Sequence, residues 1–415
     1  MEKRTSYYRI WDTLAAEKSM VFLAGPRQAG KTTLAKIIAG GFSNTLYFNW
    51  DIQEHRALLL KDPAFFTTLK RRDSSTPFVV FDEIHKYRDW KNYLKGVYDQ
   101  FGQEYRFLVT GSGRLDLYQK GGDSLAGRYL LFHLWPFTAG ELFGGKRALE
   151  DFLADPLFLA AVDPDAAAAA WGTLESLSGF PEPFLGRRPA GYRRWSANYS
   201  QSLIREDIRD LSDIRSVGAM ETLYHLIPSK VGSPLSVSSL AGDLKVAHGS
   251  VQSWLALFER FFLTFSLPTW TDRVVRAIRK ERKVYLFDSP RIKDPAACFE
   301  NMVAVELWRA VSCWNALGAG EFTLHFVRDT QKREVDFLVA NDREPLFLVE
   351  CKLADEKPAK SLFVLQEELQ VPAVQLVRDM EGYRSYRNGT LPVLITAASH
   401  WCAGLPTFTV GDNPA

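Results

Sequence analysis

The sequence lacks the segments that would place the protein in a membrane. Its 415 residues contain no run of eighteen apolar residues, and a membrane-spanning helix needs about that length. The first twenty residues have no apolar stretch followed by a cleavage site, so they do not resemble a secretory signal. We therefore expect a cytoplasmic protein with no membrane partner. The 46% hydrophobic and 24% charged fractions are ordinary for a globular protein.

Cysteine and net charge are also scarce. The four cysteines, Cys298, Cys313, Cys351 and Cys402, are scattered without metal-binding spacing, so they predict reduced core thiols and no zinc site. The formal net charge is only +2, which neither requires nor excludes a nucleic-acid partner. Local clusters of charge must therefore decide that question.

A phosphate-binding loop follows the first apolar segment. Residues 20–25 read as a short buried strand, and GPRQAGKT after it fits the pattern G-x-x-x-x-G-K-[ST]. Glycines let backbone N–H groups turn toward phosphates, and a helix over 31–39 would point its positive end at them. Lys31 would reach the β- and γ-phosphates, and the Thr32 hydroxyl would hold Mg²⁺. The residues predicted to bind ATP are Gly25, Pro26, Arg27, Gln28, Ala29, Gly30, Lys31, Thr32 and Thr33.

Two further apolar segments end in polar residues. Within 76–86 an apolar strand ends in Asp82 and Glu83. Asp82 would bind Mg²⁺ through water, and Glu83 would polarise the attacking water. The segment 105–117 carries Thr110 and Ser112 where a sensor of the γ-phosphate or of the attacking water belongs, and Ser112 is the predicted catalytic residue. Serine after glycine is also common in turns. Ligands of parallel sheets collect at such strand ends.

These motifs, with SLAGR in residues 121–142, resemble those of a group of prokaryotic AAA-type ATPases. Members of that group carry a C-terminal domain of unknown function that looks like a PD-(D/E)xK restriction-endonuclease fold. The resemblance covers most of the chain and is weakest over 150–226. It implies a homo-oligomer, a ring or dimer, in which Arg128 serves as an arginine finger for a neighbouring subunit's ATP. Arg114 is the competing candidate, and an ordinary surface arginine is the third reading.

The middle of the chain predicts helices and then a possible nucleic-acid module. Residues 163–177 predict a helix capped by Asp163 or Asp165, residues 179–195 a basic connecting loop, and residues 202–214 another helix. Two helices over 239–244 and 251–262 have helix-turn-helix spacing, and a winged-helix-like hairpin would follow them. Basic residues concentrate in that hairpin; the predicted patch is Arg273, Arg276, Arg279, Lys280 and Arg282, with Lys283 next to it. Such a patch favours contact with phosphates, whereas winged helices also serve as protein-docking modules.

A second acidic cluster lies near the C-terminus. Residues 298–311 predict an amphipathic helix that carries Glu300, and two strands would carry Asp336 and the pair Glu350 and Lys352. Side chains alternate along a strand, so Glu350 and Lys352 share one face. Asp-x(n)-Glu-x-Lys is the active-site pattern of the PD-(D/E)xK nucleases. By that pattern Asp336 and Glu350 would ligate Mg²⁺, Lys352 would orient water and Glu300 would complete the shell.

The sequence thus predicts an α/β fold in four parts: an AAA-type ATPase core (1–148), a helical linker (149–228), a winged-helix-like module (229–288) and a nuclease-like domain (289–415). The function that fits is an ATPase using ATP and Mg²⁺ that acts on DNA, as a motor or an ATP-controlled nuclease-like protein. The alternatives are an ATP-regulated oligomeric switch with a silent nuclease-like domain and, more remotely, a chaperone-like ATPase acting on protein.

Overall fold

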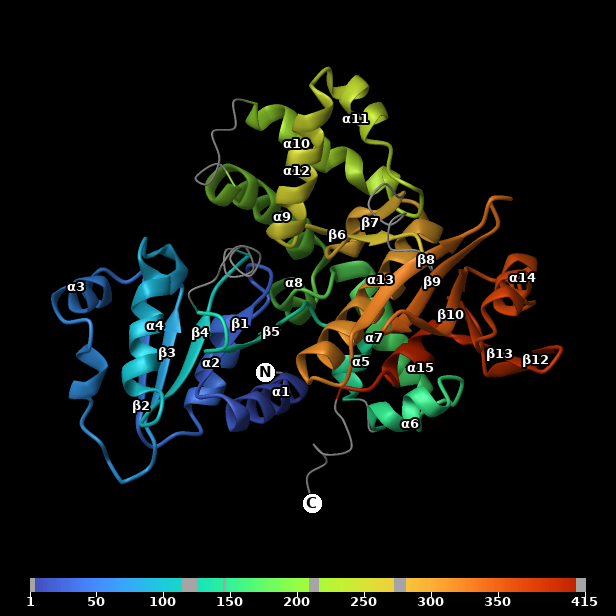
Figure 1. Cartoon of the computed structure of the whole chain (residues 1–415). Helices are drawn as coiled ribbons and strands as arrows, with labels where there is room; N and C mark the ends of the chain where they lie inside the picture. The colour runs from blue at the N-terminus through green and yellow to red at the C-terminus, as the bar shows by residue number, and fades with distance from the viewer. Residues whose placement is uncertain (1–3, 114–124, 145–146, 209–215, 272–280, 408–415) are drawn as a thin grey trace. The chain divides into compact units, whose positions relative to one another are not determined.

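The chain folds into two compact units, residues 1–135 and 136–415. The structure is a computed structural model, and it describes residues 4–113, 125–144, 147–208, 216–271 and 281–407 (Figure 1). The boundary between the units falls before the predicted boundary at 148/149.

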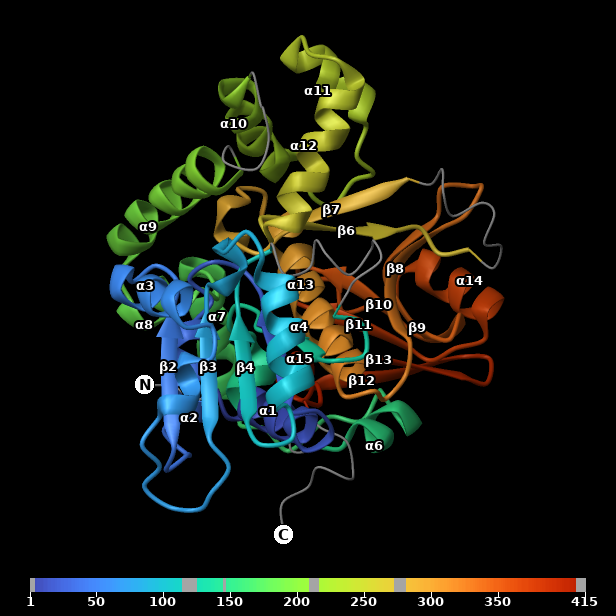
Figure 2. The same ribbon diagram turned by 60° about the vertical axis from the view of Figure 1, so that its left-hand side comes forward.

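The first unit is built around one sheet. Five parallel strands lie in the order β2-β3-β4-β1-β5, and Figure 2 shows β2, β3 and β4 side by side. The elements are α1 (Thr5–Glu17), β1 (Met20–Ala24), α2 (Lys31–Ala39), β2 (Thr45–Asn49), α3 (Gln53–Lys61), β3 (Phe78–Asp82), α4 (Trp90–Phe101), β4 (Arg106–Thr110) and β5 (Leu130–His133), with short 3₁₀ turns at Phe65–Thr68 and Ile84–Lys86.

Burial explains why these segments are strands. Every residue of β1 and β3 is buried, which fits their continuous apolar sequences because a parallel sheet with helices on its faces has no solvent side. The predicted helix at 89–102 is observed as α4, where Trp90 and Leu94 are buried and Tyr98 packs against the same core. Strand pairing sets Leu23 and Asp82 beside Thr110, so the ends of three strands meet at one edge.

The second unit begins with helices: α5 (Ala139–Phe143), α6 (Leu149–Ala154), α7 (Pro164–Leu177), α8 (Pro181–Gly186), α9 (Pro189–Ser202), a π-helical turn (Leu203–Ile208), α10 (Val217–Leu226), α11 (Val237–Leu244) and α12 (His248–Arg260). Asp163 caps α7 by accepting from the backbone of Asp165 and Ala166. The predicted loop over 179–195 is wrong, because Pro181 and Pro189 occupy the first turns of α8 and α9, where proline is tolerated. Of the helix predicted over 202–214, only Leu203–Ile208 lies within the described residues beyond the end of α9.

An antiparallel strand pair follows α12. Strand β6 (Thr264–Pro268) pairs with β7 (Arg282–Leu286). The two helices and this hairpin follow one another in the predicted order. The winged-helix assignment itself stays a prediction.

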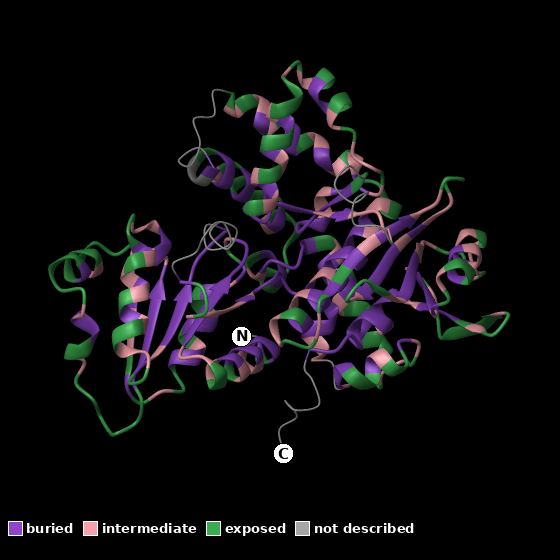
Figure 3. Ribbon diagram, in the orientation of Figure 1, coloured by how far each residue is buried: buried purple, intermediate pink, exposed green. Residues whose placement is uncertain are grey.

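The C-terminal part is a six-stranded mixed sheet in the order β12-β13-β11-β10-β9-β8. Its elements are α13 (Pro295–Ala316), β8 (Phe322–Arg328), β9 (Glu334–Asn341), β10 (Glu344–Lys352), α14 (Lys360–Leu369), β11 (Ala373–Val377), β12 (Tyr383–Asn388), β13 (Leu391–Ala397) and α15 (Ala398–Ala403). Helix α14 packs on β9 and β10 through Leu362 and Leu365. The interior strands are buried, as Figure 3 shows, and β12 is the exposed edge.

Candidate functional site

The phosphate-binding loop joins β1 to α2 and has the backbone that its glycines predict. Gly25 has a φ of 140° and Gly30 a φ of 98°, values that favour glycine. A Cβ atom at Gly25 would lie 2.3 Å from the carbonyl oxygen of Leu134, so a larger residue would clash. Because Gly30 directly precedes α2, the unpaired N–H groups of that helix's first turn lie at the loop.

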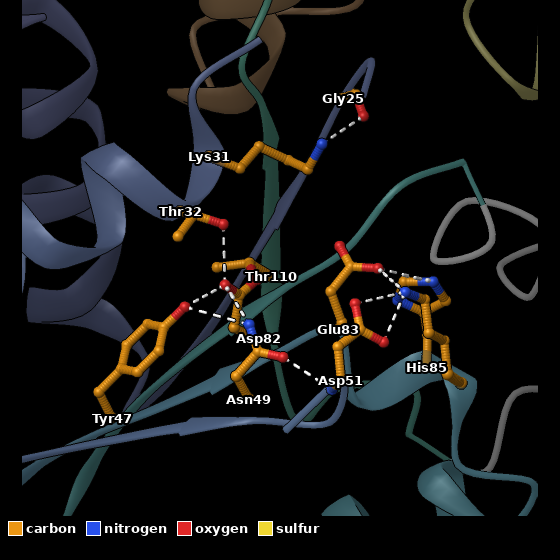
Figure 4. A network of polar contacts seen from close by, with 11 residues as sticks. Gly25, Lys31, Thr32, Tyr47, Asn49, Asp51, Asp82, Glu83, His85 and Thr110 are labelled. Atoms are coloured by element: carbon orange, nitrogen blue, oxygen red, sulfur yellow. Dashed lines mark hydrogen bonds and ion pairs between the residues drawn. The ribbon is translucent and has the colours of Figure 1, made fainter. Parts of the chain in front are cut away.

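Two buried cations hold the loop. Lys31 Nζ donates to the carbonyl oxygen of Gly25 at 2.9 Å (Figure 4). It also donates to the carbonyl oxygen of Pro26 at 2.7 Å. Arg4, which precedes α1, donates to the carbonyl oxygen of Ala29 at 2.6 Å. The ammonium of Lys31 therefore lies inside the loop, where phosphate oxygens could replace the two carbonyl acceptors.

The carboxylate of Asp82, at the end of β3, is surrounded by donors. It accepts from the hydroxyl of Thr32 at 2.8 Å, from the hydroxyls of Tyr47 and Thr110, and from the amide of Asn49 at 3.3 Å (Figure 4). Asp82 is only 1% exposed, and these four donors are all uncharged. Carboxylate and hydroxyl oxygens are ligands that Mg²⁺ prefers, so Thr32 and Asp82 fit the ion that the loop implies.

Sequence reasoning missed Tyr47 and Asn49. Both lie on β2 two residues apart, so their side chains share a face, and Asn49 pairs with Asp82 across the sheet. That alternation next to a predicted strand-end carboxylate is the signal that could have identified them. Burial raises the pKa of Tyr47 and the bond to Asp82 raises it further, so the phenol remains a donor.

Glu83 follows Asp82 with a φ of 57°, and its carboxylate lies beside a lysine and a histidine. Its carboxylate lies 3.1 Å from Lys86 Nζ and 3.7 Å from His85 Nε2, and Lys86 also pairs with Asp51 at 2.7 Å. Burial lowers the pKa of Lys86, but the charge of Glu83 and the bond to Asp51 raise it more. Lys86 is therefore a cation, and Glu83 must leave or share this ion pair to polarise a water molecule.

The other two predicted catalytic residues differ in placement. Ser112 is buried just beyond the end of β4, near the strand ends that carry Asp82. Arg128 makes a bidentate ion pair with Asp99 of α4, Nε to Oδ1 at 2.7 Å and Nη2 to Oδ2 at 3.1 Å. Its competitor Arg114 lies outside the described residues. The finger role of Arg128 stays a prediction, and it requires Arg128 to exchange Asp99 for phosphate.

The C-terminal acidic residues come together from three elements. Lys352 Nζ bonds Glu350 Oε1 at 2.5 Å, which confirms that the two side chains share a face of β10. Asp336 of β9 accepts from the backbone N–H of Cys351 at 2.8 Å. Glu300 of α13 accepts from the hydroxyl of Tyr285 at 2.7 Å.

A lysine occupies the middle of this cluster. The ammonium of Lys283, on β7, lies 3.1 Å from Glu300, 2.7 Å from Glu334 and 3.7 Å from Asp336. In the part of the chain that the structure describes, no three histidine, cysteine, aspartate or glutamate side chains are arranged to hold a metal ion. Lys283 lies between Glu300 and Asp336, and the shell of Glu300, Asp336 and Glu350 around Mg²⁺ stays a prediction.

Burial and like charge set the protonation of this cluster. Burial and the charge of Asp336 raise the pKa of Glu300 to about 7 and that of Glu350 to about 8. Burial lowers the pKa of Lys283, but the surrounding carboxylates raise it above its usual range. The lysine is therefore a cation, and Glu300 and Glu350 hold their protons more tightly than usual.

Most of the predicted nucleic-acid patch, namely Arg273, Arg276, Arg279 and Lys280, lies outside the described residues. Arg282 is exposed on β7, as a phosphate contact requires. Grouping Lys283 with these residues was wrong, because its side chain is fully buried. Lys283 and Tyr285 are two residues apart on β7, so their side chains share one face of that strand. Glu334 and Asp336 share a face of β9 for the same reason. This spacing in the sequence is the signal that could have indicated a buried Lys283.

Comparisons with known proteins agree with the ATPase domain predicted for the N-terminal part of the chain. Residues 17–143 match a family model described as an AAA domain. Two models described as domains of unknown function, DUF8612 and DUF4143, match residues 176–290 and 296–396.

The N-terminal unit contains an AAA-type ATPase domain. The loop, the strand-end carboxylate and the matching model all lie in the same segment. Among the described residues, none of the helices has the length and apolar character needed to cross a membrane.

Individual relatives are distant. Uncharacterized proteins of Mycobacterium bovis and Mycobacterium tuberculosis are each 24% identical over 270 residues, or 65% of this chain, and the chain spans about half their length (54%). The chain is 15% identical to a Walker-type ATPase of Pyrococcus abyssi, covering 70% of this chain and 94% of that one with a TM-score of 0.41. It is 15% identical to the Aeropyrum pernix ORC1 protein in complex with DNA, covering 73% and 91% with a TM-score of 0.30. With TM-scores this low, neither structure bears on the function of this chain.

Proposed function

We propose that the chain binds and hydrolyses Mg·ATP. The observation that carries this proposal is the 2.8 Å bond between Thr32 and Asp82, which joins the end of the phosphate loop to the end of β3. A hydroxyl and a carboxylate from segments 50 residues apart in sequence converge where a nucleotide-bound Mg²⁺ belongs.

Each remaining residue has a role in this proposal. Lys31 exchanges its carbonyl acceptors for the β- and γ-phosphates, and the N–H groups at the start of α2 bind phosphate oxygens. Glu83 polarises the attacking water, and Ser112 contacts the γ-phosphate. Arg128 of a neighbouring subunit offsets the charge that develops during transfer. The Mg²⁺ ion would supply charge neutralisation between the phosphates.

Two substitutions separate binding from hydrolysis. Lys31→Ala should abolish ATP binding, whereas Glu83→Gln should keep binding and trap ATP, because only water activation is lost. Exposed Glu104→Gln is a matched control that should behave like wild type. Equal hydrolysis rates in all four proteins would refute the assignment.

We further propose that the chain acts on DNA through its middle segment. The helix pair α11 and α12 and the hairpin β6–β7 support this proposal, as does exposed Arg282 at the start of β7. Phosphate contacts release counterions, so affinity should fall steeply with salt. Replacing Arg276, Arg279 and Arg282 with glutamine should weaken binding to all sequences and flatten that dependence. Unchanged DNA affinity would indicate protein docking instead.

A second candidate is an ATP-regulated switch whose nuclease-like domain is catalytically silent. The position of Lys283 among the carboxylates favours it, because a lysine cannot bring water to a phosphodiester as a metal does. The test is incubation with Mg²⁺ or Mn²⁺ and single strands, duplexes or forks, with and without ATP. Cleavage that Asp336→Ala removes, with ATPase activity retained, would reject the silent domain.

A further inference from the structure

Lys283 is the most completely enclosed charge in the second unit's acidic cluster. Its residue is 0% exposed, and its ammonium lies within 4 Å of three carboxylates that come from α13 and β9. It also lies 5.5 Å from the ring centre of Phe326, a cation–π distance. Moving an ammonium out of water is expensive unless oppositely charged groups surround it, so this arrangement is specific rather than incidental.

The carboxylate oxygens that face Lys283 already have partners, whereas Oε2 of Glu350 is buried and has no hydrogen-bond partner among the described residues. The Oδ1 atom of Asp336 faces Lys283 at 3.7 Å, and its Oδ2 atom accepts from the backbone of Cys351. Glu300 Oε1 accepts from both Lys283 and Tyr285, and Glu350 Oε1 is bonded to Lys352. Divalent ions bind carboxylate oxygens at about 2.0 to 2.6 Å. An ion between Glu300 and Asp336 would therefore have to replace the ammonium.

We infer that Lys283 is the resident cation of this cluster and keeps divalent metal ions out of it. The acids Glu300, Glu334, Asp336 and Glu350 pair with Lys283, Lys352 and Arg328. Removing Lys283 leaves the space between Glu300 and Asp336 without its cation, so a divalent ion would be free to bind there. This inference deepens the silent-domain candidate. It concerns residues of the second unit alone, so it stands or falls independently of ATP hydrolysis.

The experiment measures Mn²⁺ binding to the full chain without nucleotide, by calorimetry. Wild type should show no Mn²⁺ site that depends on Asp336. Lys283→Met should gain one Mn²⁺ site. Its affinity should exceed any residual affinity of the wild-type cluster by on the order of a hundredfold, because a unit positive charge a few ångströms away is lost. Adding Asp336→Asn should remove the gained site. Exposed Lys360→Met, on the same domain, should behave like wild type.

A second variant guards against loss of folding. Lys283→Met leaves buried acids without their partner, whereas Lys283→Met with Glu334→Gln removes one charge of each sign and keeps Glu300, Asp336 and Glu350. Mn²⁺ should raise the melting temperature of this double variant more than that of wild type.

Two results would overturn the inference. One is a wild-type Mn²⁺ site that Asp336→Asn abolishes, since Lys283 would then be no barrier. The other is a folded double variant that binds no Mn²⁺, since the lysine would then not be what excludes the ion. Because the N-terminal residues are the same in all proteins, binding at Thr32 and Asp82 cancels from the comparison.

Discussion

Asp82 in the first unit and Asp336 in the second are carboxylates on strands, each within a polar cluster. The groups around them differ in charge. Hydroxyl and amide groups donate to Asp82, and all four are neutral. Asp336 shares its cluster with the buried ammonium of Lys283.

This difference separates a carboxylate that is ready for a metal from one that is already compensated. Neutral donors satisfy the lone pairs of Asp82 but leave its charge, so an incoming Mg²⁺ gains the full attraction. A lysine compensates the charge of a carboxylate as well as its lone pairs, so a metal ion that binds Asp336 must first displace the ammonium of Lys283. Whether an acidic motif binds a metal ion therefore depends also on the basic residues that other segments bring to it.

The largest expected effect is at Asp82. Asp82→Asn keeps the shape of the side chain but removes the charge that supports Mg²⁺, so ATP hydrolysis should fall by about four orders of magnitude. The measurement is the steady-state rate of phosphate release at saturating ATP. Exposed Asp12→Asn is the matched control and should hydrolyse ATP at the wild-type rate. Retained hydrolysis in Asp82→Asn would remove the basis of the comparison.

Arg128 tests whether hydrolysis is shared between subunits. Arg128→Ala should lower the rate by about a thousandfold, because the transition state loses a guanidinium. Mixing it with Lys31→Ala chains should restore part of the activity, since each variant supplies the half that the other lacks. Asp99→Asn, which frees Arg128 from its ion pair, should not lower the rate. Wild type that hydrolyses ATP normally while remaining monomeric at micromolar concentration would contradict this prediction.

The first unit was the more predictable of the two from sequence. Phosphate binding requires a fixed spacing within one short segment, so GPRQAGKT already specified the strand, the turn and α2. Tyr47 was missed because its role arises only when β2 pairs beside β3. Lys283 was misread as surface charge for the same reason, since its partners Glu300 and Glu334 are contributed by other elements.

The middle of the chain shows a different cause of error. Prolines and arginines over 179–195 indicated a loop, because proline breaks a helix interior. In the structure Pro181 and Pro189 start helices, and Tyr192 and Trp195 are buried on α9. The spacing of these two aromatics would have indicated a helix face if it had been weighed against the prolines.

Glu306 extends the comparison to a third kind of compensation. This buried acid of α13 accepts from the backbone N–H groups of Ala139 and Gly140, at the start of α5. Burial raises its pKa to about 7, and nearby Arg309 lowers it only in part. The backbone donors and Arg309 together therefore leave Glu306 costly to ionise.

The consequence is a pH-dependent stability. Between its usual pKa of 4.5 and about 7, the folded chain holds a proton on Glu306 that the unfolded chain releases, so stability should fall as pH rises through this window. Glu306→Gln should flatten that fall by roughly 3 kcal/mol or less. Urea unfolding at pH 5 and pH 7.5 measures it, with exposed Glu321→Gln as the control. Parallel pH profiles for wild type and Glu306→Gln would show that backbone donors compensate the charge fully.

The smallest effect is expected at Tyr47. It shows how much metal binding changes when a neutral donor is lost, for comparison with the loss of the charge of Lys283. Tyr47→Phe removes one neutral donor to Asp82 and leaves Thr32, Thr110 and Asn49 in place. A neutral hydrogen bond contributes about 1 kcal/mol, so the Mg²⁺ concentration for half-maximal hydrolysis should change by no more than about fivefold. Lys283→Met should change Mn²⁺ affinity at its own cluster by far more, since a charge and not a dipole is lost. If Tyr47→Phe shifted the Mg²⁺ requirement as much as Lys283→Met shifts Mn²⁺ binding, charge would not be the property that distinguishes the two centres.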